Sequence, residues 1–408
     1  MDYSGIARAD APLRQPELGV STHAHHETGL VVAIAEFPLQ AQVLEQWRGL
    51  GRNALVPNLF YEADFAQAAA HAFGKGVKVA LFFTSDGELV FAWPFLISSK
   101  RWGLPLRAMI GWHHNFSALG VPLIHRDHDS AALRCFLALP RIVPGLPRRV
   151  WLPLVPDTGA FSEPLKNHCA QLGLRTALFE CHARAMWQRG ERDDPLNTLS
   201  AGSRSKLRQE YRRLEKDGTI VFETLNKVID ILPALEEYFE LEATGWKGRI
   251  GTAIPQSAAE AMFMRNAVKA YAEQERLRIH RLRIGETTIA SSITYITGDH
   301  AWYTKISFND RYARNSPGSQ LVLKVTEAFR RGEAQSADSC APPGHPLMAR
   351  FWPLRFGLSN VLLELESRHN LYVLTVQLEK LRLLARQLNR SRREYMGRWV
   401  RSYGGAKT

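Results

Sequence analysis

The sequence predicts an α+β protein with a mixed α/β sheet, built from two halves that share one order of elements. Short apolar stretches of alternating polarity are typical of strands, and turn sequences such as Ser85-Asp86-Gly87 and Gly285-Glu286 connect them. Longer stretches with apolar residues at helical spacing lie between these strands. The predicted order in each half is β-α-α-βββ-α-β-α-β. The order repeats without a repeat of the residues, and it indicates two related domains.

The first predicted domain spans residues 29–188 and follows a polar tail, residues 1–28, that we expect to be disordered. The charged, irregular stretch between Ala185 and Leu199 is expected to contain the domain boundary. We expect strands at 30–35, 77–84, 88–97, 106–112, 150–155 and 174–181, and helices at 40–50, 61–73, 130–139 and 163–172.

The second predicted domain spans residues 196–370 and begins with a basic helix over 203–217. A basic C-terminal helix, within residues 371–408, follows it. In the second domain we expect strands at 219–225, 277–284, 288–297, 301–308, 335–339 and 361–366, and helices at 229–244, 258–275, 316–332 and 346–356.

Charge and cysteine usage narrow the class of protein. The 408 residues carry a net charge of +12, which favours anionic partners such as a nucleotide, a nucleic acid or an acidic membrane surface. The four cysteines are far apart and form no Cys-x-x-Cys pair, so we expect no metal site and no disulfide framework. No apolar run reaches the ~18 residues that a membrane span needs. These features predict a soluble, cytoplasmic protein.

One strand–loop–helix segment, residues 302–332, has the composition of an anion site. Ser316 is placed to cap the helix, Pro317 suits its first position, and Gly318 lets a ligand come close to the backbone. The unpaired N–H groups and the positive end of the helix dipole would face a phosphate. The alternative is a plain connection, because Ser-Pro also starts helices that bind nothing.

Three further stretches carry a resemblance to a known family. They are the basic helix 203–218, the sequence Gly245-Trp246-Lys247-Gly248-Arg249, and the loop 311–318. Together they resemble the CelD-like, cellulose-biosynthesis-type GNAT acyltransferases, relatives of the FemAB peptidyltransferases, over residues 30–371. The resemblance implies a tandem GNAT fold and transfer from acyl-CoA to an amine or hydroxyl of an envelope-related or polysaccharide-related acceptor.

The resemblance and the residue chemistry together assign three groups of site residues. The strand and helix that would hold acyl-CoA contain Tyr303, Lys305, Arg314, Ser316, Pro317, Gly318, Ser319 and Gln320. Substrate contacts are expected from Arg204, Lys206, Arg208, Trp246, Lys247 and Arg249. The alternative for the first three is a solvated basic face. The alternative for the last three is a helix end that Gly245 caps, with Trp246 packed into the core. The candidate general bases are Glu242, Asp310 and Asp338, with structural salt bridges as the alternative role for each.

Three kinds of partner would suit the predicted C-terminal helix. Its apolar side and its basic residues would suit an anionic membrane surface, packing on the domain, or a second subunit in a homodimer. These residues are Leu374, Leu378, Leu381, Leu384 and Leu388, and Lys380, Arg382, Arg386, Arg390, Arg392, Arg393, Arg398 and Arg401.

Two other functions of the whole protein also stay open. One is a FemAB-like transfer from aminoacyl-tRNA, and the other is a non-catalytic binding or scaffold protein with the same fold.

Overall fold

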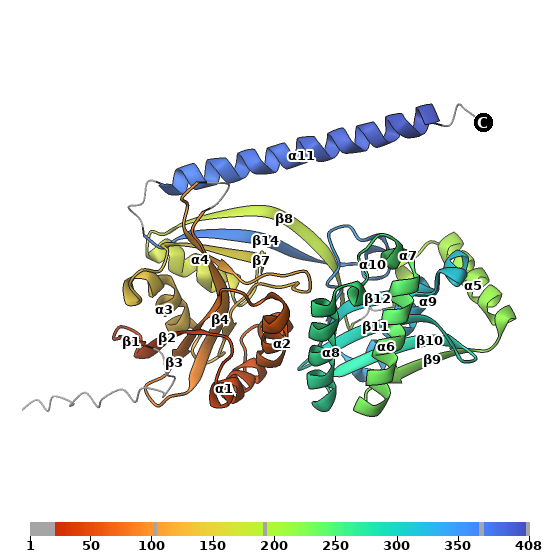
Figure 1. The fold of residues 1–408 in the computed structure, drawn as a ribbon, viewed down its shortest axis with the longest axis horizontal. Coiled ribbons are helices and arrows are strands. Elements are labelled where there is room, and N and C mark those ends of the chain that lie inside the picture. Colours follow the sequence, from red (N-terminus) through yellow and green to blue (C-terminus); the bar gives the residue numbers. More distant parts are fainter. Residues whose placement is uncertain (1–20, 101–103, 191–193, 367–370, 405–408) are drawn as a thin grey trace, which may run out of the picture.

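All fourteen described strands join in a single mixed sheet that runs through both halves of the chain. The structure is a computed structural model that describes residues 21–100, 104–190, 194–366 and 371–404, with the backbone alone for Leu371 and residues 390–404. Figure 1 shows the two halves side by side, with the sheet continuing between them. The predicted mixed α/β architecture is therefore confirmed.

The first half has the predicted order of elements, with two short strands in addition. The tail includes strand β1, which pairs with β2, so the ordered part of the chain begins before residue 29. The elements are β1 (Thr22–His25), β2 (Leu30–Glu36), α1 (Ala41–Arg52), α2 (Ala63–Phe73), β3 (Val77–Phe83), β4 (Leu89–Ser98), β5 (Ala108–Gly111), β6 (Leu123–Ile124), α3 (Asp129–Ile142), β7 (Arg149–Pro156), α4 (Ser162–Gln171) and β8 (Arg175–Gln188).

The second half repeats this order. Its α-helices and strands are α5 (Ala201–Leu214), β9 (Ile220–Leu225), α6 (Val228–Thr244), α7 (Trp246–Arg249), α8 (Ala258–Glu273), β10 (Leu277–Ile284), β11 (Thr287–Thr297), β12 (His300–Phe308), α9 (Pro317–Ala328), β13 (Ser336–Asp338), α10 (Pro346–Phe351), β14 (Leu354–Glu364) and α11 (Leu371–Gly404). Short 3₁₀ turns η2 (Pro195–Thr198) and η5 (Asp310–Asn315) precede α5 and α9, and a π-helical turn, Phe329–Glu333, follows α9.

The two halves exchange their last strands. Strand β14 of the second half lies between β7 and β8 of the first half, and β8 in turn pairs with β13 of the second half. Each half therefore completes the sheet of the other. The single sheet therefore continues across the region between Ala185 and Leu199, where the sequence predicts a domain boundary.

Helices from both halves also pack together. Phe65 of α2 meets Phe263 of α8 edge to face, with ring centroids 5.3 Å apart. The Tyr271 hydroxyl of α8 donates to Glu62 (2.8 Å), and Arg276 forms an ion pair with the same carboxylate (2.7 Å). A continuous apolar core extends through these contacts, so the halves are held by burial as well as by strand pairing.

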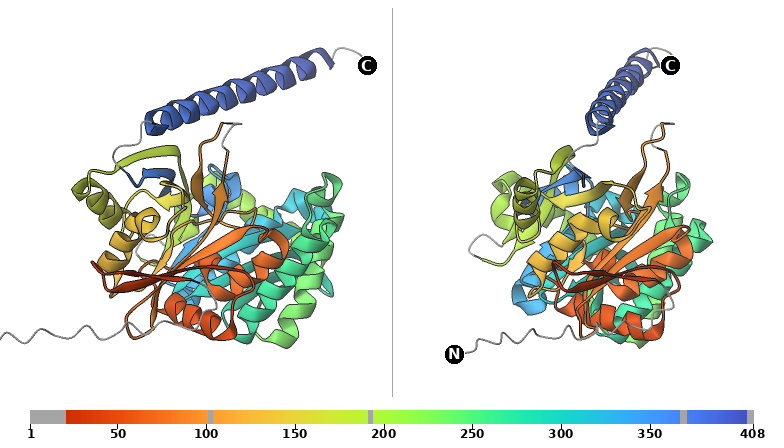
Figure 2. Two further views of the ribbon diagram at one scale, coloured as in Figure 1. Left: turned by 60° about the vertical axis from the view of Figure 1, so that its left-hand side comes forward. Right: turned by 90° about the vertical axis from the view of Figure 1, so that its left-hand side faces the viewer.

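Helix α11 lies outside the body formed by the other elements, as Figures 1 and 2 show. Near its start, Tyr372 packs with Trp151, Phe179 and Leu362, and Val376 and Leu383 pack against this cluster. Of the five leucines that the sequence singled out, Leu378 is partly buried, and the other four are exposed: Leu374, Leu381, Leu384 and Leu388. The basic side chains from Arg390 onward lie outside the described side chains. Within the described ranges, none of the helices combines the length and apolar character that a membrane span requires.

Candidate active site

Strand β13 ends at Asp338, opposite Trp302, and beyond that point one edge of β12 has no strand partner among the described residues. The two strands pair in parallel from His300 to Trp302, with Trp302 opposite Asp338. Beyond that point, the described pairing of β12 is to β11 alone. The edge from residue 303 to residue 308 therefore borders the space beyond the end of β13, which we call the gap between β12 and β13, and an extended ligand could bond to backbone groups there.

A β-bulge at Thr304 decides which side chains face this gap. Ile293 of β11 pairs with Lys305 and Thr294 pairs with Tyr303, so Thr304 is the extra residue, and its hydroxyl donates to the Ile293 carbonyl (3.1 Å). A bulge reverses the alternation of side chains along a strand. Tyr303 is accordingly buried against Trp352, at a centroid distance of 5.8 Å, and belongs to the core. Only the backbone of Tyr303 therefore lies on the β12 edge, and its predicted contact with a cofactor stays a prediction, whereas the Lys305 side chain points into a cavity.

The cavity beside Lys305 lies where the two halves meet. It measures about 70 Å³ and receives residues from a loop of the first half and from β11, β12 and α8 of the second. The Lys305 ammonium lies 4.4 Å from the centre of the Phe116 ring, a distance at which cation and ring attract. The lining residues are Phe65, Asn115, Phe116, Ser117, Ala118, Met264, Tyr295, Thr304, Lys305 and Cys340.

Lys305 is held without a carboxylate partner among the described residues. Burial lowers its pKa, and the nearby Lys247 lowers it further, while the more distant Glu242 and Glu260 oppose this effect. Cys340 shares the cavity, and burial raises the pKa of its thiol, with Asp338 adding to the increase. The thiol is therefore a poor nucleophile at neutral pH. An amine of lowered pKa in a cavity is the kind of group that accepts a proton in catalysis.

Glu242, a predicted general base, has both carboxylate oxygens occupied. Oε1 accepts from the Tyr238 hydroxyl (2.9 Å) and from the Lys247 ammonium (2.5 Å), and Oε2 accepts from the Ile254 amide (2.8 Å). The carboxylate is buried. It therefore anchors the turn after α6. Lys247 connects this turn to β12, because its ammonium also donates to the Ile306 carbonyl (3.3 Å).

Asp338 and Asp310 are also paired. The buried Asp338 carboxylate accepts from Arg184 Nη2 (2.5 Å) and from the Cys340 amide (2.8 Å). Asp310 accepts from Arg249 Nη2 (2.6 Å) at a more exposed position. All three predicted bases thus have a basic partner, which is the structural alternative that the sequence left open.

The loop that carries Gly245 and Gly248 is organised by backbone contact. A Cβ atom on Gly248 would lie 1.8 Å from the Ala243 carbonyl oxygen, so only glycine fits against α6 at this position. Trp246 begins α7 and is about half exposed, whereas Lys247 and Arg249 bind Glu242 and Asp310. The two cations therefore tie this loop to α6 and η5, whereas the Trp246 side chain is exposed and forms no such ion pair.

The start of α9 is more enclosed than the sequence predicted. Ser316 adopts a left-handed conformation (φ 50°), and its side chain makes no capping hydrogen bond. The Ser319 and Gln320 amides both donate to the Ser316 carbonyl, and Pro317, Gly318 and Ser319 are buried. Gln320 donates its side-chain amide to the Leu207 carbonyl of α5 (2.9 Å). Arg314 is exposed in η5 beside this helix start.

The residues on α5 lie apart from the Lys305 cavity. Arg204 and Arg208 line a second groove, between α5 and α9, whereas Lys206 projects into solvent 3.9 Å from Glu210. The structure therefore divides the predicted substrate residues between the α5 groove and the loop beside β12. Sequence reasoning missed Arg184 and the loop 115–118, because their roles depend on contacts between the halves and neither lies in a recognisable motif.

Comparisons with known proteins match part of the second half of the chain to a family of domains. Residues 201–342 match the family described as acetyltransferase (GNAT) domain. No curated protein sequence matches the chain. Among solved structures, FemX is 10% identical, with 81% of this chain and 98% of FemX covered at a TM-score of 0.52.

Two further structures resemble the chain more loosely. One is L-PGS from Bacillus licheniformis, which is 12% identical and covers 85% of this chain and 98% of its own at a TM-score of 0.47. The other is a tandem GNAT protein from the clavulanic acid biosynthesis pathway, which is 13% identical and covers 82% and 99% at a TM-score of 0.40. The chain has the GNAT fold, with the domain match in its second half. Among the described residues, no group of His, Cys, Asp or Glu side chains converges in a way that could hold a metal ion.

Proposed function

We propose that the protein is a GNAT-type acyltransferase whose reaction takes place at the Lys305 cavity. The donor is acyl-CoA, and the acceptor is an amine or hydroxyl of an envelope-related or polysaccharide-related molecule, as the CelD-like resemblance implies. The observation that carries this proposal is the open edge of β12 leading to a cavity with an amine that has no carboxylate partner among the described residues.

The donor would bind along the gap between β12 and β13. Pantetheine is an extended chain with two amides, which suits hydrogen bonding to the edge from 303 to 308 in the manner of an added strand. The pyrophosphate would lie at the start of α9, where Arg314 is exposed and the Gly318 amide makes no described hydrogen bond. The thioester would then reach the cavity from the β12 side.

Lys305 would act on the proton of the acceptor. Its lowered pKa increases the fraction of neutral amine, which can take the proton as the acceptor attacks the thioester carbonyl. The new C–N or C–O bond forms, the C–S bond breaks, and the CoA thiolate leaves with the proton that Lys305 returns. Most of the rate enhancement would come from holding the acceptor and thioester in contact.

Transfer from aminoacyl-tRNA is the second candidate. The FemX-like fold and the basic surface of α5 support it. It predicts RNA binding whose affinity falls steeply with salt. A scaffold protein with this fold predicts no turnover with either donor.

Thermal unfolding and turnover measurements distinguish these three candidate functions. Coenzyme A, acetyl-CoA and longer acyl-CoAs should raise the unfolding midpoint, because a ligand at about 100 times its dissociation constant stabilises by ~2.7 kcal/mol. Lys305→Met should abolish acyl transfer while CoA still raises the midpoint. Lys269→Met is the matched control, because Lys269 is an exposed lysine on α8 outside the cavity.

Each contrary outcome points to a different error. No midpoint shift with any CoA compound would refute the donor and favour aminoacyl-tRNA. Full turnover by Lys305→Met would refute the role of Lys305 and leave the donor site standing.

A further inference from the structure

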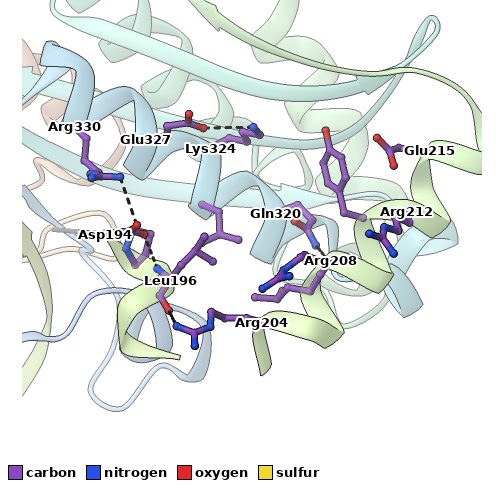
Figure 3. Close-up of a pocket in the computed structure, with 14 residues that line it drawn as sticks. Asp194, Leu196, Arg204, Arg208, Arg212, Glu215, Gln320, Lys324, Glu327 and Arg330 are labelled. Atoms are coloured by element: carbon purple, nitrogen blue, oxygen red, sulfur yellow. Dashed lines mark hydrogen bonds and ion pairs between the residues drawn. The ribbon is translucent and has the colours of Figure 1, made fainter. Parts of the chain in front are cut away.

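A second and larger groove lies between α5 and α9. Its volume is about 540 Å³, and it shares no lining residue with the Lys305 cavity. Figure 3 shows basic side chains from both helices and a short segment before α5 around this space. The lining residues are Asp194, Pro195, Leu196, Arg204, Leu207, Arg208, Tyr211, Arg212, Glu215, Gln320, Leu323, Lys324, Glu327 and Arg330.

Three arginines of α5 form a row along one wall. Arg204, Arg208 and Arg212 follow one another at intervals of four residues, so they lie on one side of the helix, about 6 Å apart along its axis. None of the three forms an ion pair with a described carboxylate, and Arg204 donates to the Leu196 carbonyl (3.5 Å). Guanidinium groups bind phosphate with two parallel hydrogen bonds, so this wall can accept an anion.

The opposite wall is largely neutralised. On α9, Lys324 pairs with Glu327 (3.4 Å), and in the π-helical turn that follows, Arg330 lies 3.8 Å from Asp194. Two of the three acidic side chains that line the groove are thus matched to bases, which leaves Glu215 at the end of α5. Three arginines of α5 and one carboxylate, Glu215, therefore stay without an ion-pair partner among the described residues, and the groove is basic.

The interior between these walls is apolar. Leu207 and Leu323 face the groove from α5 and α9, and Leu196 and Tyr211 extend this surface. Leu207 is buried, and Tyr211 is partly exposed in the groove. A volume of about 540 Å³ lies within the range of small-molecule sites, roughly 300–1,000 Å³. Such a site suits a ligand with an apolar body and an anionic end.

We propose that the groove binds a phosphate carried on an apolar chain, with the phosphate on Arg208 and Arg212 and the chain on Leu207 and Leu323. A soluble alkyl phosphate and a lipid headgroup share this chemistry. The inference does not depend on the acyltransferase activity, since it concerns binding at a separate groove. It is tested by binding alone, so failure of one proposal leaves the other intact.

The direct experiment is calorimetric titration of the full chain with dodecyl phosphate below its micelle concentration. Wild-type protein should bind it, and Arg208→Ala and Arg212→Ala should each weaken binding about tenfold or more, a loss of roughly 1.4 kcal/mol. Lys206→Ala is the matched control, because Lys206 is on the same helix but does not line the groove. Leu323→Asp should also weaken binding of dodecyl phosphate, because it places a charge where the alkyl chain would lie. Unchanged unfolding midpoints show that the variants are folded.

The other probes distinguish the ligand classes. Dodecyl maltoside should not bind, and inorganic phosphate should bind much more weakly than dodecyl phosphate. Co-sedimentation with vesicles containing phosphatidic acid tests the lipid source. A lipid ligand is indicated if the groove variants no longer sediment with the vesicles while Lys206→Ala still does. No binding of dodecyl phosphate or of these vesicles would overturn the proposal. It would also be overturned if phosphate bound as tightly as dodecyl phosphate, or if RNA alone bound through these arginines.

Discussion

The buried ion pair between Arg184 and Asp338 provides a sharp test of what Asp338 does. The two side chains are 3% and 2% exposed, and the Arg184 Nη2 to Asp338 Oδ2 distance is 2.5 Å. Asp338→Asn keeps the shape and the acceptor for the Cys340 amide but removes the charge. An uncompensated Arg184 would then remain buried across the contact between β8 and β13. Breaking a buried pair from one side costs about 3–5 kcal/mol.

Urea unfolding followed by tryptophan fluorescence measures this loss as a lower midpoint. The matched control is Asp310→Asn, whose partner Arg249 is 63% exposed. This second pair should contribute less than about 1 kcal/mol. If Asp338→Asn keeps wild-type stability but loses acyl transfer, the structural role argued here is wrong and Asp338 is a catalytic base.

Three further predictions concern the site and its supports. Lys305→Met should be more stable than wild type at neutral pH, because burial lowers the pKa of Lys305 below its unfolded value. Between those two pKa values the unfolded state binds more protons than the folded state, so the free energy of unfolding of the wild type rises with pH. The stability advantage of Lys305→Met, measured as the difference in urea midpoint, should therefore shrink as the pH approaches about 10. Gly318→Leu should weaken CoA binding in calorimetry while Gly318→Ala does not, since a Cβ there would lie 3.5 Å from the Phe308 side chain and a larger side chain must displace the side chains of Phe308 and Ile306. Gly248→Ala should lower the free energy of unfolding by a few kcal/mol, because its Cβ would lie 1.8 Å from the Ala243 oxygen; a stability equal to wild type would contradict that contact.

Local pattern predicted the elements and their order. The alternation in 301–308 and the helical spacing after Pro317 correspond to β12 and α9, and the tight turns produced the meanders of both halves. These features depend on residues close together in the chain, which set the side that is buried and where a helix begins. The match of residues 201–342 to the GNAT domain follows from the same stretch that carried the resemblance.

The candidate site could be predicted only in part. The sequence pointed to Lys305 through the strand pattern, but the alternation also included Tyr303, because nothing in the residues signals the bulge at Thr304. Likewise, Glu242 has the chemistry of a general base in the sequence. Its burial with Lys247 and the Ile254 amide makes it an anchor instead.

The sequence by itself determined the fold class, the order of elements and the basic row on α5. Tertiary structure alone decided that β14 and β8 are exchanged between the halves, that the loop 115–118 covers Lys305, and that α5 and α9 enclose a groove. The physical reason is separation along the chain. Pairing β14 with β7 joins residues about 200 positions apart. Which such pairing is most stable depends on the packing of the whole core, which no local pattern contains.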